Sequence, residues 1–132
     1  KDIRIPLVED VWVAIKHSKN ELNESLWDVY VVNDKSEAIE GVLVSSRGYG
    51  SLQNDNRKTD TFRHFLDEIS AQSAKKIEPI TEEVFGINNE YWLSFFFNGK
   101  LYDKKYIFLS ETIIEDHLVD VPILNSKGIL IK

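Results

Sequence analysis

The sequence predicts an all-β fold, an antiparallel β-sandwich of seven to nine strands with one or two short helical turns. Apolar residues alternate with polar ones in short runs, as in strands that bury one face. These runs recur about every 8–15 residues with turn residues between them, and there is little helical periodicity. Strand number and spacing favour the immunoglobulin-like type of sandwich. The length of 132 residues suits a single domain over 1–132.

Five of the expected strands lie in the first part of the chain. They are VWVAIKH from Val11, LWDVYVVND from Leu26, AIEGVLVSS from Ala38, DTFRHFL from Asp60 and AKKIEPIT from Ala74. Pro79 cannot donate a ladder hydrogen bond, so the last strand ends there or lies on a sheet edge. We expect Trp27 to pack between the sheets. Trp12 is mostly a core candidate as well; it points away from the apolar face of its strand, so a surface position near an edge is the alternative.

The segment RGYGSLQNDNRK, from Arg47 to Lys58, is expected to be the longest loop. It contains two glycines, two asparagines and an aspartate, and it lacks apolar periodicity. Long loops on rigid sandwiches often carry binding residues. Arg47, Tyr49 and Arg57 are therefore candidate ligand-binding residues for an anion or a carboxylate. The alternative is a solvated loop without a site, which such weak motifs favour.

The second part of the chain supplies helical turns, a hairpin and a tail. TEEVFG predicts a turn that Thr81 caps and Gly86 closes. SETIIEDHL predicts one or two further turns behind a cap at Ser110. The tail VDVPILNSKGILIK supplies one or two short strands.

The hairpin is YWLSFFFNGKLYDKKYIFL, from Tyr91 to Leu109. Asn98-Gly99 predicts a two-residue type I′ turn, because that turn needs positive φ at both central residues. This turn fixes which residues lie opposite one another on the aromatic-rich face, which we expect to be the core face. The expected pairs are Phe97 with Lys100, Phe95 with Tyr102, Leu93 with Lys104 and Tyr91 with Tyr106.

The same register places Trp92 and Phe96 on the opposite face, where a sandwich normally shows polar residues. Two explanations stand side by side. The tail or the segment 110–118 covers these rings, which is favoured because contiguous exposed aromatics are uncommon on monomers. Alternatively, Trp92 and Phe96 are partner-binding residues in a contact patch.

Several kinds of chemistry are poorly supported. The chain has no cysteine, which removes disulfides, thiol catalysis and cysteine-bound zinc. His17, His64 and His117 lie far apart without the spacing of a metal site, and there is no GxSxG serine motif. Adjacent Glu82 and Glu83 would point about 100° apart on a helix. We therefore expect no catalytic residue, no metal, no cofactor and no enzymatic activity.

Charge and composition bear on the partners and the compartment. A net charge of −6 disfavours nucleic acid and anionic membranes, because like charges repel. No apolar run approaches the roughly 18–20 residues of a membrane span. The chain has no methionine, so we expect a trimmed N-terminus. The lack of cysteine fits a reducing cytoplasm and a disulfide-free exported protein equally well; cytoplasmic is our expectation.

Four stretches carry a resemblance: IRIPLVEDVWVAI, DVYVVNDKSEAIEGVLVSSRGYG, NNEYWLSFFFNGKLYDKKYIF and VPILNSKGIL. Together they resemble a group of short uncharacterised bacterial proteins of about this length, over nearly the whole chain. Some members of that group carry the label phenylalanyl-tRNA synthetase alpha subunit. The shared stretches are strands and turns, so the resemblance implies a common fold and adds little about activity.

Two function classes remain from the sequence. The first is a non-enzymatic interaction module that binds a protein partner through an exposed sheet face or an edge strand, with Trp92 and Phe96 at the contact. The second is a small-ligand-binding or enzymatic domain that uses the 47–58 loop, with Arg47, Tyr49 and Arg57 around one pocket. The first is preferred, because no catalytic constellation is present.

Overall fold

The strands pair into two antiparallel sheets, and the alternation of apolar residues determines which face of each sheet is buried. The computed structural model describes residues 6–52 and 55–132, and their side chains apart from those of 51–52 and 55–57. Within these residues there are ten strands, two short 3-10 turns and no α-helix. The all-β prediction is confirmed, although the strands outnumber the seven to nine expected.

Sheet A has the strand order β6-β2-β1-β10-β9. β1 and β2 form a hairpin, and β10 pairs with the other side of β1. β1 is therefore a central strand with neighbours on both sides, whereas β6 is an edge strand, as Pro79 predicts. The strands are β1 (Val11–Lys19), β2 (Ser25–Asn33), β6 (Ser73–Ile80), β9 (Val119–Val121) and β10 (Ser126–Ile131).

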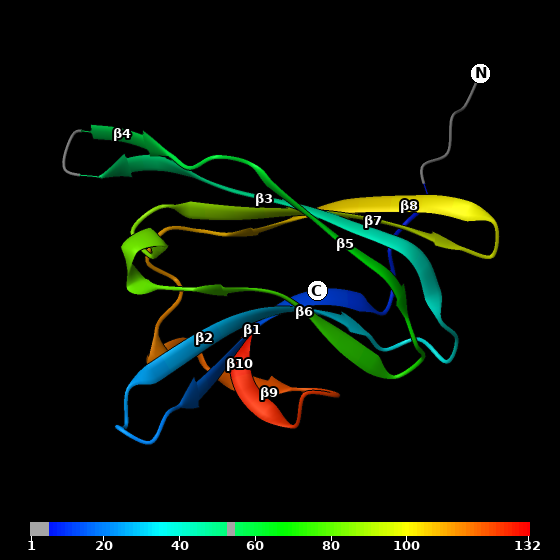
Figure 1. Cartoon of the computed structure of the whole chain (residues 1–132), viewed down its shortest axis with the longest axis horizontal. Helices are drawn as coiled ribbons and strands as arrows, with labels where there is room; N and C mark the ends of the chain where they lie inside the picture. Colours follow the sequence, from blue (N-terminus) through cyan, green and yellow to red (C-terminus); the bar gives the residue numbers. More distant parts are fainter. Residues whose placement is uncertain (1–5, 53–54) are drawn as a thin grey trace.

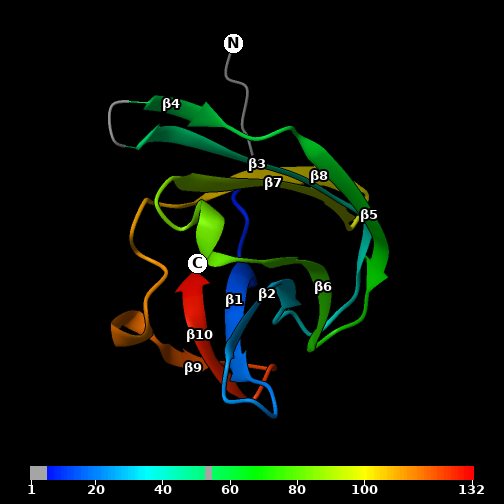
Figure 2. The ribbon, with the colours of Figure 1, turned by 60° about the vertical axis from the view of Figure 1, so that its left-hand side comes forward.

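Sheet B has the order β4-β3-β7-β8, and β5 also pairs with the first part of β3. The strands are β3 (Ile39–Leu52), β4 (Asp55–Lys58), β5 (Phe62–Ile69), β7 (Asn88–Phe97) and β8 (Lys100–Phe108). Figures 1 and 2 show sheet B as one layer and β1, β2 and β10 as the other. The two sheets packed together make a β-sandwich, but this strand order does not confirm the immunoglobulin-like type.

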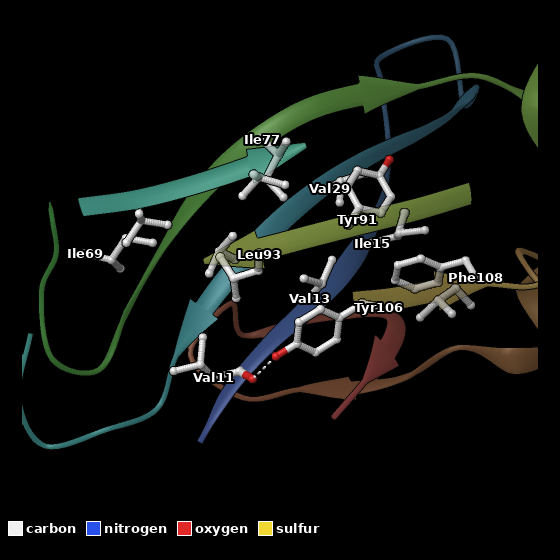
Figure 3. Packing of buried hydrophobic residues seen from close by; sticks show 14 of the residues in the cluster. Val11, Val13, Ile15, Val29, Ile69, Ile77, Tyr91, Leu93, Tyr106 and Phe108 are labelled. Atoms are coloured by element: carbon white, nitrogen blue, oxygen red, sulfur yellow. Dashed lines mark hydrogen bonds between the residues drawn. The ribbon is translucent and has the colours of Figure 1, made fainter. Parts of the chain in front are cut away.

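The main core lies between the sheets (Figure 3). β1 contributes Val11, Val13 and Ile15, which alternate along the strand and are buried. The Tyr106 hydroxyl donates a hydrogen bond of 2.7 Å to the carbonyl of Val11, which links β8 to β1 across the core. Trp27 is buried in the same core, as predicted, with its ring edge-on to Phe85.

The β7–β8 hairpin has the predicted register in every pair. Asn98 and Gly99 both have positive φ, at 52° and 74°, as a type I′ turn requires. Sheet B therefore directs Tyr91, Leu93 and Phe95 inward, and Trp92 and Phe96 outward.

The prediction of a loop over residues 47–58 is wrong. Its first part continues β3 and its last part is β4, which accounts for the additional strand. The glycines mark a close approach rather than a turn: a Cβ on Gly48 would lie 2.9 Å from Ile87 Cδ1. Thr59 also binds Gly48, because its hydroxyl accepts from the Gly48 amide at 2.7 Å and its own amide donates to the Gly48 carbonyl at 2.8 Å.

Both predicted helical turns exist, as single 3-10 turns. The turn η1 (Glu82–Val84) has Thr81 at its N-cap, as predicted, although the Thr81 side chain makes no capping hydrogen bond. The turn η2 (Glu115–His117) follows Ile114, so the predicted cap at Ser110 is wrong. A single 3-10 turn leaves few amide groups in need of a cap, so a nearby serine is a weak signal for its start.

A second apolar cluster covers the outer face of sheet A. It contains the buried residues Trp12, Ala14, Val32 and Val121, with Ile123 and Leu124 packed against them. Trp12 is only 8% exposed, so the prediction of a core residue is confirmed and the alternative, a surface position near an edge, is wrong. The reason is that β1 is central in its sheet and that the segment between β9 and β10 folds over it.

Candidate functional site

The outer face of sheet B carries large apolar side chains from four strands. The register aligns Leu43 of β3 with Phe65 of β5 on one side and with Ser94 of β7 on the other. Trp92 and Phe96 flank Ser94 on β7, where alternation points all three outward. We call this surface the open face, and its apolar residues are Leu43, Phe65, Trp92, Phe96 and Leu101.

The open face is exposed. Trp92 is 45% exposed and Phe96 is 49% exposed, and the other three side chains are exposed as well. The covering explanation is therefore wrong among the described residues: the tail lies on Trp12 of sheet A instead. In Figures 1 and 2 no labelled strand forms a further layer on the outer side of β3, β7 and β8. Contiguous exposed apolar patches of this kind are characteristic of contact surfaces.

A β-bulge positions Phe96. The pairing of β3 with β7 shifts between Glu40 and Leu43, and Gly41 in this bulge has a φ of 57°. The Phe96 ring lies on the bare backbone of Gly41, since a Cβ there would be 3.1 Å from Phe96 Cδ2. Glycine thus serves two needs, a left-handed conformation and a flat seat for an aromatic ring.

Charged side chains lie around and between these apolar residues. The Lys105 ammonium lies 4.7 Å from the centre of the Trp92 ring, and Arg47 Nε forms an ion pair of 3.0 Å with Glu90. The guanidinium approaches the second Glu90 oxygen at 3.5 Å. Exposed charged residues of this face that form no ion pair with any other described residue include Glu40, Arg63, Asp103 and Lys105.

A pocket of about 210 Å³ opens between the two sheets at the end of the sandwich. Its polar lining includes Ser46 and Tyr91 of sheet B and Glu78 of sheet A. Its apolar lining includes Phe62, Ile80 and Val84.

Glu78 is the centre of a hydrogen-bond network behind this pocket. Tyr91 donates its hydroxyl to Glu78 Oε2 at 2.8 Å, and Ser46 donates to Oε1 at 3.3 Å. His64 Nε2 lies 3.2 Å from the same Oε1 and 3.4 Å from the Ser46 hydroxyl. A nucleophilic triad needs the histidine to meet serine and carboxylate through different nitrogens. Here one nitrogen meets both, so the network joins the edge strand β6 to sheet B and does not activate Ser46.

Two core tyrosines have raised pKa values. Burial raises the pKa of Tyr91 far above its usual range, and the negative charge and hydrogen bond of Glu78 raise it further. Burial also raises the pKa of Tyr106. Both hydroxyls therefore stay protonated in the folded protein and act as donors that connect the sheets.

Two of the three residues predicted for the 47–58 site lie together, and the side chain of the third is outside the described residues. Arg47 and Tyr49 lie together, with the Arg47 guanidinium carbon 5.1 Å from the Tyr49 ring centre. Arg47 lines the pocket, but Glu90 already neutralises its charge. The backbone of Arg57 pairs with Gly50, and its side chain lies outside the described residues.

Sequence reasoning did not identify Ser46, Glu78 or Tyr91 as pocket residues. His64 is partly buried and contacts both Ser46 and Glu78. Glu78 and Ser46 are 32 residues apart and come from different sheets, so no local spacing signals their contact. Glu90 was missed for the same reason, since its partner Arg47 is 43 residues away.

No family model, curated protein or solved structure was found to match this chain. Within 6–52 and 55–132, no cluster of three or more histidine, aspartate or glutamate side chains is arranged to hold a metal ion. The same residues include no helix with the length and apolar character needed to cross a membrane. The arguments for function therefore come from the open face and the pocket themselves.

Proposed function

We propose that this protein is a non-enzymatic interaction module that binds a protein partner through the open face of sheet B. The observation that supports this is the contiguity of five exposed apolar side chains on one sheet face, with Trp92 and Phe96 at the centre. Tryptophan is enriched at the energetic centres of protein interfaces. Burying the exposed halves of Trp92 and Phe96 contributes about 1 kcal/mol each.

The face is a better binding surface than the edge strands. β8 is an edge of sheet B, and its sequence places Lys104 and Lys105 along that edge. Lysines on an edge strand oppose the addition of another strand. A partner that contacts the face meets Lys105 beside the Trp92 ring instead, where the ammonium is compatible with an aromatic or acidic contact.

Site-specific photo-crosslinking tests the proposal. A benzoyl-phenylalanine replaces Phe65, an exposed aromatic residue of the open face, and a control protein carries it at Glu115 in η2. The proteins are made in cells that naturally express the chain and are irradiated there. We expect a discrete crosslinked polypeptide from position 65 only, and its loss when Trp92→Ser is added. Absence of any crosslink specific to position 65 would contradict the proposal.

The pocket supports a second candidate function, the binding of a small ligand. Glu78 presents a carboxylate between the two sheets beside apolar walls, a combination suited to a small molecule with an amine group. Fragment amines titrated into labelled protein should shift the amide signals of Ser46 and Glu78, and Glu78→Gln should abolish the shifts. The matched control is Glu83→Gln on η1, which should leave them unchanged; equal shifts in all three proteins would exclude this site.

A further inference from the structure

We infer that the protein on the open face is a second copy of this chain, packed face to face on sheet B about a two-fold axis. This inference rests on the proposed function, because it names the occupant of the same surface. The axis crosses the strands between two neighbouring rows of outward side chains. One row contains Arg63, Ser45, Trp92 and Lys105, and the next contains Phe65, Leu43, Ser94 and Asp103.

The size of the open face fits a dimer. Four strands at about 4.8 Å spacing, over roughly 30 Å of strand length, present about 500–600 Å² of planar face on each copy. Two such faces give more than about 1,000 Å² in total, the lower bound for a specific interface. Two sheets packed in this way align within about 30°, as the sheets of a sandwich do.

The side chains match each other under this axis. Rotation about this axis places each residue of one row opposite a residue of the neighbouring row in the second copy. The two facing residues come from the same strand of the sheet. Trp92 then meets Ser94 of the second copy and Leu43 meets Ser45, so that large side chains oppose small ones. Interdigitation of large and small residues is what a close-packed interface needs.

The charges match under the same axis. Lys105 meets Asp103 of the second copy, and Arg63 meets the ring of Phe65. One row further out, Arg47 meets Glu40. Every one of these contacts occurs twice in a symmetric dimer. The exposed charges that form no ion pair among the described residues of one chain thus gain partners in the dimer.

The alternative two-fold axis, parallel to the strands, is disfavoured by the same charges. Rotation about that axis places each row opposite the same row of the second copy, with the order of the strands reversed. Residues of β5 in one copy then face residues of β8 in the other. Arg63 would then approach Lys105 of the second copy twice, and like charges across an interface are costly. The distribution of charge along the strands therefore selects one orientation.

Sedimentation equilibrium tests the inference on the whole chain. The wild-type mass should rise from 15.3 kDa toward twice this value between micromolar and submillimolar concentrations. Asp103→Lys and Lys105→Asp should each weaken dimerisation at least tenfold, because each creates two like-charge contacts. The double variant exchanges the two charges and should restore the wild-type constant to within about threefold. The matched control exchanges Lys127 and Asp120, an exposed ion pair on sheet A, and should change nothing.

The outcomes separate this inference from the proposed function. Crosslinks from position 65 to a second copy of the chain support both. A monomeric mass at every concentration, with a crosslink to a different polypeptide, overturns the dimer and leaves the interaction module standing. A monomeric mass without any crosslink overturns both. A dimer that Trp92→Ser or the single charge reversals leave intact, in variants with wild-type circular dichroism, overturns the face-to-face arrangement.

Discussion

Each sheet has a tryptophan on its outer face, but only the tryptophan of sheet A is covered. Trp12 lies at the centre of sheet A and is buried beneath Ile123 and Leu124, whereas Trp92 lies at the centre of sheet B and is about half exposed. A lysine ammonium also accompanies each ring, from Lys132 and Lys105 respectively. The chain thus contains a segment able to cover an apolar face and places it on sheet A. The exposure of Trp92 on sheet B is the observation on which the proposed partner contact rests.

The largest expected effect is a difference in unfolding free energy between a variant of Trp12 and a variant of Trp92. Trp12→Ala should lower the free energy of unfolding by about 3–5 kcal/mol, because it leaves a cavity under the covering segment. Trp92→Ala should cost less than about 1 kcal/mol in dilute monomer, since half of the ring is already in water. Urea unfolding at low protein concentration measures both. Equal losses would mean that the two faces do not differ as described.

Neighbouring residues of β7 show the same contrast between a covered and an exposed ring. Tyr91 points inward and is buried, whereas Trp92 points outward and is exposed. Burial raises the pKa of Tyr91 and of Tyr106, so the folded state keeps both phenols protonated when the unfolded chain ionises them near pH 10. This contribution to stability is fully present below pH 10 and is lost as the pH rises above that value. The free energy of unfolding should fall by up to about 1.4 kcal/mol per pH unit for each tyrosine.

Two phenylalanine variants check this pH dependence. Tyr91→Phe and Tyr106→Phe should each remove one tyrosine's share of the slope between pH 10 and 11.5, measured by urea unfolding at fixed ionic strength. The double variant should show the shallowest slope. A slope that is unchanged in both single variants would show that the tyrosines ionise in the folded protein.

The sequence predicts the local features of this fold well. The period-two runs identify most strands, and Asn98-Gly99 determines the whole β7–β8 register and the outward position of Trp92 and Phe96. These features depend on residues close together in the chain, where alternation and turn geometry act directly. The expected loop at 47–58 failed because Gly48 looks like a turn residue, whereas it marks contact with Ile87.

Features that depend on distant contacts could not be predicted. Whether Trp12 or Trp92 is covered depends on where the segment around Ile123 folds, more than 100 residues from Trp12, and the alternation is the same on both strands. The pocket network around Glu78 likewise joins three strands of sheet B to one of sheet A. Contacts between residues so far apart in the chain produce no recognisable spacing pattern in the sequence.

A smaller effect is expected when the cover of sheet A is made polar. Ile123→Ser with Leu124→Ser should cost about 1–2 kcal/mol of unfolding free energy, because both side chains are partly buried over Trp12. Iodide should then quench two of the three tryptophans instead of Trp92 alone. The matched control, Leu22→Ser in the exposed β1–β2 turn, should change neither quantity. Unchanged quenching with lowered stability would show that Trp12 is protected by something other than this segment.

The smallest change in stability is expected on the open face itself. Trp92→Ser with Phe96→Ser should alter the free energy of unfolding of the monomer by less than about 1 kcal/mol, because neither ring belongs to the core between the sheets. The same variant should lose the crosslink at position 65, because the central rings of an interface contribute most of its binding energy. Urea unfolding and crosslink yield, measured on one preparation, give both values. A variant that unfolds would place the two rings in the structural core, and a stable variant with an undiminished crosslink would show that the partner contacts another surface.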